Sequence, residues 1–243
     1  EIRKAEILLT GWGSRNVPPE VSEDPGRLRY ICHLTGTLNG QIPVEVIRSP
    51  IPVTNWGDAP ARKIAEGAFC LLLALLKQLR VHIHVRETGG WNPGEAMQWS
   101  GSLDGLQLGV YGLGFIGRTF IDFCRPFETD IRVFDPYATD IPDFVERVDS
   151  LDALFSKSQA GAVHAGLTDE TRGSVNARLL AMLPDGGILV NTARGAVVDH
   201  DALFRELESG RLRAGLDVLH YCEPDDSGET SERGRDWLPP HHP

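Results

Sequence analysis

The sequence has no hydrophobic run long enough to cross a membrane. Its longest apolar stretch is AFCLLLALL, residues 68–76, whereas a membrane-spanning helix needs about 20 apolar residues. No apolar leader follows the opening residues EIRK, so we expect no secretory signal. These two absences predict a soluble protein without a membrane partner.

Basic residues and cysteine are also scarce. The chain has 24 lysine and arginine residues against 34 acidic ones, which gives a formal net charge of −10. Nucleic acids bind basic surfaces, so we expect no nucleic-acid partner. The four cysteines lie far apart and form no C-x-x-C pair, which predicts free thiols and a cytoplasmic location.

Metal ligands are not gathered anywhere in the sequence. His82 and His84 are two positions apart on an expected helix, so their side chains do not share a helix face. No cluster of cysteines or acidic residues accompanies them. We therefore expect no metal site.

What the sequence does contain, from Asp58 onward, is a regular alternation of apolar strands and amphipathic helices. Several of the strand segments are apolar on both faces, which is typical of a parallel sheet covered by helices. We expect strands at residues 106–111, 131–134, 160–166, 188–192 and 213–218, and helices at 61–80, 116–125, 150–157, 176–183 and 201–210. The first of these helices is apolar all round from Ala68 to Leu76, which predicts burial within the domain or at a subunit interface.

Residues 1–60 show a different sequence pattern. Short apolar segments at 6–10, 28–36, 44–47 and 51–55 are separated by proline and glycine, and we expect all four to be strands. We therefore predict a small domain at 1–60 and a larger domain at 61–243.

The segment VYGLGFIGRTF, residues 110–120, places three glycines in six positions between an expected strand and an expected helix. In this context G-x-G-x-x-G is a dinucleotide-binding fingerprint. Gly112 makes the tight turn, Gly114 lets a pyrophosphate approach the backbone, and Gly117 lets the helix pack against the strand. The larger domain is therefore predicted to be a Rossmann-type, doubly wound parallel sheet.

The fingerprint needs an acidic residue about 20 positions further on, and Asp135 in VFDPY lies 23 positions after Gly112. Its carboxylate accepts hydrogen bonds from ribose hydroxyls and repels a 2′-phosphate, so the predicted cofactor is NAD rather than NADP. Two other nucleotide-binding classes are disfavoured. No tyrosine is followed by lysine four positions later, and Gly117 is followed by Arg118 and Thr119 rather than by the Lys-Ser/Thr of a P-loop.

The ordered set of motifs resembles the D-isomer-specific 2-hydroxyacid dehydrogenase family. The resemblance covers nearly the whole chain and rests on GLGFIG (112–117), VFDPY (133–137), VHAGLTDET (163–171), NTARGAVVD (191–199), and AGLDV followed by CEP (214–218, 222–224). It implies that residues 1–60 are a partial, flavodoxin-like α/β substrate domain. It also implies hydride transfer between NAD and a small 2-hydroxy or 2-oxo acid, in a cleft between two domains. It also implies a homodimer built through residues 61–80 and 88–102.

The resemblance implies three catalytic residues. Arg194 in NTARG binds the carboxylate and carbonyl of the substrate, for which its guanidinium fork is suited. His241 exchanges the proton of the substrate hydroxyl, with His242 as the alternative, because Pro240-His241 follows the family's proline-histidine pattern. Glu223 orients that imidazole.

Further contacts are implied residue by residue. Phe115 and Ile116 offer backbone N–H groups to the pyrophosphate, Thr192 and Ala193 line the nicotinamide side, and Asp217 meets the carboxamide. The segment LTGTLNG (34–40) stands where the family has a glycine-rich loop that holds the substrate carboxylate. In it, the candidates are Gly36 and Thr37.

The sequence departs from the family pattern in several places. Gly166 replaces an expected proline, Gln159 replaces an expected acid, and the loop at 34–40 lacks its usual acidic residue. The substrate domain also looks shorter than the family's, so a fragment is one interpretation. The alternative function is therefore a non-catalytic NAD-binding sensor or interaction module, or a truncated, inactive family member.

Overall fold

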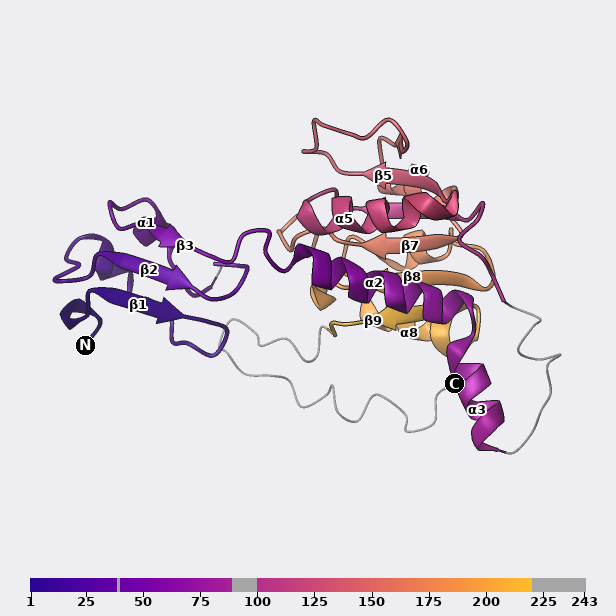
Figure 1. Ribbon diagram of the computed structural model, residues 1–243, viewed down its shortest axis with the longest axis horizontal. Coiled ribbons are helices and arrows are strands. Elements are labelled where there is room, and N and C mark those ends of the chain that lie inside the picture. Colours follow the sequence, from indigo (N-terminus) through magenta and orange to yellow (C-terminus); the bar gives the residue numbers. More distant parts are fainter. Residues whose placement is uncertain (39, 89–99, 220–243) are drawn as a thin grey trace. The chain divides into compact units, whose positions relative to one another are not determined.

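The computed structural model describes residues 1–38, 40–88 and 100–219, and the chain divides into two compact units, Glu1–Pro60 and Ala61–Pro243 (Figure 1). Each unit has its own apolar core.

The first unit is built on a three-stranded parallel sheet in the order β1-β2-β3. Its strands are β1 (Ile7–Thr10), β2 (Tyr30–His33) and β3 (Val53–Thr54), and its helices are η1 (Ile2–Lys4), η2 (Pro19–Ser22) and α1 (Val44–Ile47). The helices contribute Val21 and Val46 to a core that also contains Ile31 of β2. This core lies on one face of the sheet, because alternate residues of a strand point to opposite faces.

The strand expected at residues 44–47 is wrong, since this segment forms helix α1. The carbonyl of Pro43 accepts hydrogen bonds from the N–H groups of Val46 (3.0 Å) and Ile47 (3.1 Å), which starts a helical turn. Burial of Val46 in the core then outweighs the β-propensity of the valines.

The second unit contains a six-stranded sheet, all parallel, in the order β6-β5-β4-β7-β8-β9. The strands are β4 (Gln107–Tyr111), β5 (Asp130–Phe134), β6 (Glu146–Arg147), β7 (Ala160–Val163), β8 (Gly187–Asn191) and β9 (Leu212–Leu216). Five of them were predicted, and the two-residue edge strand β6 was not. The strand order reverses direction at β4, between β5 and β7, which is where ligands bind in open α/β sheets.

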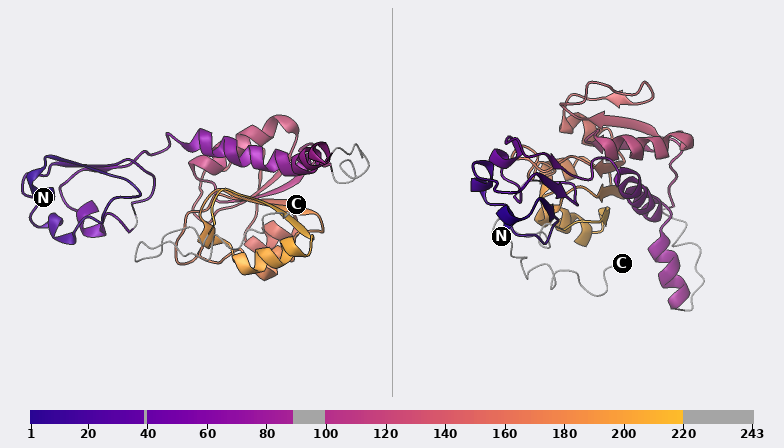
Figure 2. Two further views of the ribbon diagram at one scale, coloured as in Figure 1. Left: turned by 90° about the horizontal axis from the view of Figure 1, so that it is seen from below. Right: turned by 60° about the vertical axis from the view of Figure 1, so that its left-hand side comes forward.

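Helices cover both faces of this sheet (Figure 2). They are α2 (Ala61–Leu76), α5 (Phe115–Cys124), α6 (Leu151–Ser156), α7 (Ala177–Leu180) and α8 (His200–Glu208). The unit also contains α3 (Leu79–Glu87), none of whose residues is buried, and the short turns η3 (Arg125–Phe127) and η4 (Gly195–Val197). Residues of α2 and α5 pack in one apolar cluster with the strands, and residues of α6, α7 and α8 pack in a second. The Rossmann-type doubly wound fold is confirmed.

The single helix expected over residues 61–80 is wrong in two respects. Gln78 adopts a left-handed conformation with φ 52°, so α2 ends at Leu76 and α3 begins as a separate helix. The run 68–76 is also not buried all round within the unit. The buried positions of α2 are Ala61, Ala65, Ala68, Leu72 and Leu76, while Phe69, Leu71, Leu73 and Leu75 are partly buried against the same core. Cys70, in the middle of the run expected to be buried all round, is exposed. The alternative, burial at a subunit interface, stays a prediction.

No helix in the described part of the chain combines the length and the apolar character that a membrane span requires.

Candidate functional site

The three glycines of the turn after β4 differ in whether the surrounding protein leaves room for a side chain. Gly112 has φ +96°, and a Cβ there would lie 2.6 Å from the backbone nitrogen of Ala165. A Cβ on Gly117 would overlap the carbonyl oxygen of Gly112. By contrast, apart from its two neighbours in the chain, no residue of the described protein has an atom within 4 Å of a Cβ built on Gly114. The protein's own packing therefore requires two of the glycines, and the third leaves open space beside the turn.

The N-terminus of α5 faces this open space. Gly114 is its N-cap residue, and no side chain of the described protein caps the helix. The first N–H groups of a helix have no partner within the helix, and they carry the positive end of its dipole. The turn can therefore accept an anionic group at the N–H groups of Phe115 and Ile116.

Asp135 follows β5, and its carboxylate is fixed beside the turn. Oδ2 accepts a hydrogen bond from the N–H of Leu113 (2.7 Å), and Oδ1 accepts from the N–H groups of Tyr137 (2.8 Å) and Ala138 (3.1 Å). A carboxylate has about four acceptor positions, so one on Oδ2 remains for another donor. Fixed in this way, Asp135 can accept from a ribose hydroxyl at the end of the sheet.

The loop after β8 carries Thr192, Ala193 and Arg194, and the buried side chain of Asn191 shapes it. The amide of Asn191 accepts a hydrogen bond from the N–H of Ala193 (3.0 Å) and donates one to the carbonyl of Arg194 (3.0 Å). These two bonds replace the strand pairing that ends at Asn191. The loop is therefore held rigid at the same sheet edge as the glycine turn.

Arg194 is half-buried, and its Nη1 donates a hydrogen bond to the carbonyl of Ala193 (2.7 Å). Among the described residues, no acidic side chain forms an ion pair with it. A guanidinium has five N–H donors in a planar fork, so donors remain for a carboxylate.

His164 follows β7 and was not predicted as a site residue. Its ring packs against Phe120 of α5, with the ring centroids 4.8 Å apart, and its Nδ1 lies 3.4 Å from Oγ1 of Thr192. The other ring nitrogen, Nε2, is buried without a hydrogen-bond partner in the described part of the chain. Burial lowers the pKa of His164 to about 4, so the imidazole is neutral at physiological pH. The sequence signal was its place in VHAGLT, directly after a strand.

The predicted cofactor residues lie at one edge of the second unit's sheet, where the carboxyl ends of its strands meet. Backbone hydrogen bonds join the strand ends there: the N–H of Gly112 to the carbonyl of Phe134 (3.0 Å), and the N–H of Asp217 to the carbonyl of Asn191 (3.0 Å). The residues at this edge are Gly112, Gly114, Phe115, Ile116, Gly117, Asp135, Thr192, Ala193, Arg194 and Asp217. Three predicted residues, Glu223, His241 and His242, lie outside the described residues.

The remaining predicted residues, Gly36 and Thr37, belong to the first unit and follow β2. A Cβ on Gly36 would lie 2.5 Å from Nε1 of Trp56, and the side chain of Asn55 donates a hydrogen bond to the carbonyl of Gly36 (2.5 Å). Gly36 is therefore required by local packing as well as being a candidate for ligand contact.

The family model for the D-isomer specific 2-hydroxyacid dehydrogenase NAD binding domain matches residues 69–242. The chain belongs to this family. It is 38% identical over 180 residues to a hydroxypyruvate reductase of Thermotoga maritima, covering 72% of this chain and 57% of the relative. To a glycerate dehydrogenase of Hyphomicrobium methylovorum it is 37% identical over 174 residues, covering 67% and 53%. The chain thus spans about half the length of these curated relatives.

Among solved structures, the chain is similar to a D-lactate dehydrogenase from Aquifex aeolicus complexed with NAD and lactic acid. The TM-score is 0.79 and the identity 27%, covering 96% of this chain and 72% of that one. A glyoxylate reductase from Paecilomyes thermophila gives a TM-score of 0.75 at 28% identity, covering 88% and 67%. These matches and the sheet topology place this 2-hydroxyacid dehydrogenase family member among Rossmann-type proteins.

NAD is the cofactor of this domain family, and the residues of this chain fit it. Open space at Gly114, an uncapped α5 N-terminus and a fixed Asp135 carboxylate are the features that a pyrophosphate and a ribose need.

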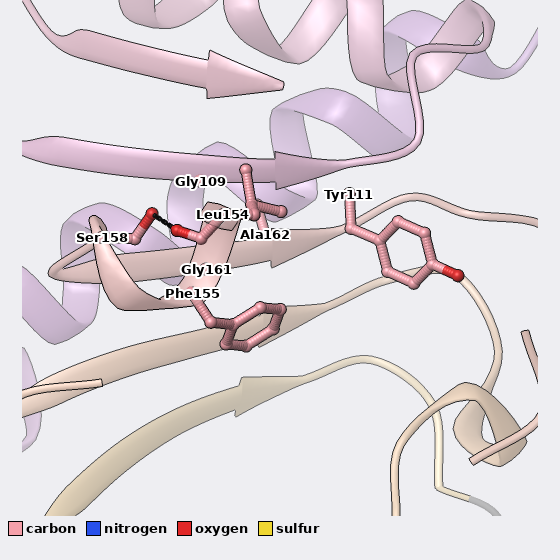
Figure 3. Close-up of a pocket in the computed structure, with 7 residues that line it drawn as sticks. All are labelled: Gly109, Tyr111, Leu154, Phe155, Ser158, Gly161 and Ala162. Atoms are coloured by element: carbon pink, nitrogen blue, oxygen red, sulfur yellow. Dashed lines mark hydrogen bonds between the residues drawn. The ribbon is translucent and has the colours of Figure 1, made fainter. Parts of the chain in front are cut away.

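A narrow hollow elsewhere in the second unit, too small to hold a water molecule, does not belong to this site (Figure 3). It lies between β4, β7 and α6, and its lining residues are Gly109, Tyr111, Leu154, Phe155, Ser158, Gly161 and Ala162. Ser158 uses its hydroxyl to donate to the carbonyl of Leu154 (2.6 Å), and a Cβ on Gly109 would lie 2.5 Å from that hydroxyl oxygen. The hollow is thus a packing feature between helix and sheet.

Proposed function

We propose that the protein is an NAD-dependent oxidoreductase that transfers a hydride between NAD(H) and a small 2-hydroxy or 2-oxo acid. One observation carries the proposal. Arg194 offers a guanidinium at the sheet edge that also bears the glycine turn and Asp135, on a loop that Asn191 holds rigid. The names of the relatives, hydroxypyruvate reductase and glycerate dehydrogenase, support the same class of substrate.

In the proposed mechanism, Arg194 binds the substrate carboxylate and polarises the carbonyl oxygen that becomes the hydroxyl. NAD, when bound, supplies the acceptor or donor of the hydride. His241, or His242 as the alternative, gives or takes the hydroxyl proton, and Glu223 orients that imidazole. Gly36 and Thr37 offer backbone N–H groups to the substrate carboxylate.

Cofactor binding is assigned to residues of the glycine turn and the strand ends. We propose that Phe115 and Ile116 hold the pyrophosphate, with Gly112, Gly114 and Gly117 shaping the turn. Asp135 holds the adenosine ribose, Thr192 and Ala193 line the nicotinamide, and Asp217 accepts from the carboxamide.

The test is NADH oxidation by the 243-residue chain with glyoxylate, hydroxypyruvate, pyruvate and longer 2-oxo acids. Arg194→Ala should lower kcat/KM on the order of a thousandfold, because a charged partner of the carboxylate is lost. Arg205→Ala is the matched control, since it removes an exposed arginine from α8. Turnover that survives Arg194→Ala would remove the mechanism, and NADH binding without turnover in the unaltered chain would indicate the non-catalytic module.

We also propose a cytoplasmic homodimer. The free thiols of Cys32, Cys70 and Cys124 support a reducing compartment. Helix α3 supports the dimer, because none of its residues is buried, and its apolar Leu79 and Ile83 are 51% and 50% exposed on one face. We assign that face to a second copy of the chain. Light scattering should give the mass of a dimer, and the pair Leu79→Glu and Ile83→Glu should give a monomer.

A further inference from the structure

The first unit has a histidine buried at the end of its second strand. His33 is only 1% exposed, and it lies on the same sheet face as Ile31 of the apolar core. Burial of a polar side chain is unfavourable unless its hydrogen-bonding groups find partners. The partners of His33 therefore indicate what the residue does.

Both ring nitrogens of His33 are hydrogen-bonded to threonine hydroxyls. Nδ1 lies 2.8 Å from Oγ1 of Thr10, the last residue of β1, and Nε2 is bonded to Oγ1 of Thr35, in the loop after β2. Thr10 and Thr35 are themselves buried, with 4% and 8% exposed. A hydroxyl can donate or accept, so the two threonines suit an imidazole in either tautomer.

The same loop is tied to the third strand as well. The N–H of Trp56 donates to the carbonyl of Thr35 (3.5 Å), and the Asn55 side chain donates to the carbonyl of Gly36 (2.5 Å). Gly36 also lies directly against the indole of Trp56. The carbonyls of Thr35 and Gly36 are therefore held from the end of β3, while His33 of β2 holds the hydroxyl of Thr35.

We propose that His33 is a positioning residue that acts through Thr35 to set the backbone of Gly36 and Thr37 for a substrate carboxylate. The proposal rests on the function proposed above, in which those two residues bind the substrate. His33 takes no part in proton transfer, because both of its ring nitrogens are occupied and buried. Thr35 transmits its effect, since the threonine precedes Gly36 directly.

The two threonines provide a matched pair of variants. Thr35→Val and Thr10→Val each replace one hydroxyl by a methyl group of similar size, and each removes one hydrogen bond to the same ring. Loss of the Thr35 bond should raise KM for the best 2-oxo acid roughly tenfold, with little change in kcat, because one hydrogen bond no longer orders the loop. Thr10→Val should change KM less than about threefold. Neither variant should change the Kd of NADH measured by fluorescence.

A second pair of variants, at His33 itself, distinguishes an effect on loop position from a loss of stability. This pair does not depend on either threonine variant folding. Glutamine places a polar atom near the position of Nε2, and asparagine places one near Nδ1. His33→Gln should therefore keep KM closer to that of the unaltered chain than His33→Asn does. Thermal unfolding of all four variants accompanies the kinetics.

The possible outcomes separate the two proposals. Equal KM shifts in Thr35→Val and Thr10→Val, no shift in either, or a lower KM for His33→Asn than for His33→Gln would overturn the positioning role and leave the proposed function standing. An unaltered chain that turns over no 2-oxo acid would overturn both.

Discussion

The two units hold their strand-end loops in different ways. In the second unit, the loops after β4 and β8 are shaped by glycines and by side chains that bind backbone groups, as Asn191 and Asp135 do. In the first unit, Asn55 likewise binds a backbone carbonyl of the loop after β2, but this loop also depends on side chains bonded to one another, with His33 between Thr10 and Thr35. The glycine turn of the second unit tolerates no added atom at Gly112 or Gly117, whereas the loop of the first unit depends on the identity of a few polar groups.

Their sheets differ as well. The six-stranded sheet has an apolar cluster on each face. The three-stranded sheet has one cluster, and on its other face Ile7 and Leu9 are 58% and 60% exposed. Parallel sheets are normally covered on both faces. We therefore expect the first unit to be the less stable one and to respond differently to substitution on its two faces.

The largest expected effect concerns the glycine turn. Gly117→Ala should lower the free energy of unfolding of the second unit by about 3 kcal/mol, because its Cβ overlaps the Gly112 carbonyl. Gly114→Ala should leave that free energy within about 0.5 kcal/mol and raise the Kd of NADH at least tenfold. Urea unfolding and NADH fluorescence titration measure the two quantities. Equal losses of stability in the two variants would mean that a side chain at position 114 also collides with the protein.

The next effect sharpens the contrast between the faces of the first unit. Ile31→Ala should destabilise this unit by roughly 2–4 kcal/mol, because Ile31 is fully buried in its core. Leu9→Ala, on the exposed face, should change stability by less than about 1 kcal/mol. Hydrogen exchange of peptides from β1 and β2 localises the measurement to this unit. A large loss in Leu9→Ala would mean that the exposed face is covered in solution.

The smallest effect is a pH dependence specific to the second unit. His164 has its pKa lowered to about 4 by burial, while an unfolded histidine has a pKa of 6.5. Below pH 6.5 the unfolded chain takes up a proton that the folded chain does not, so stability is lost as the pH falls from 6.5 towards 4. Between pH 7 and pH 5 the loss from this residue should be about 2 kcal/mol.

Urea unfolding of His164→Gln at both pH values isolates that contribution, because the other titrating groups are shared with the unaltered chain. The variant should lose correspondingly less stability on acidification. An identical loss in both proteins would mean that His164 is solvated or finds a partner.

The sequence predicted most of the second unit because its strands are continuous apolar runs and its glycine turn is a local motif. It predicted less of the first unit, where VEVI (44–47) suits a strand by composition but forms a helix once Val46 is buried. The break at Gln78 gave no local signal, since glutamine is a good helix former.

The site residues that belong to short local motifs were predictable from the sequence. Gly112, Asp135 and Arg194 each follow a recognisable strand, whereas the roles of His164 and His33 depend on neighbours distant in sequence, such as Thr192 and Thr10. The roles given to Glu223 and His241 stay predictions, because these residues lie outside the described part of the chain.

Gly114 differs from the other two glycines of the turn in what would preserve it during evolution. Folding alone preserves Gly112 and Gly117, because any side chain there collides with the protein itself. Nothing in the described protein preserves Gly114. A descendant that stopped using the dinucleotide would be free to acquire a side chain at this position first, while still keeping the other two glycines.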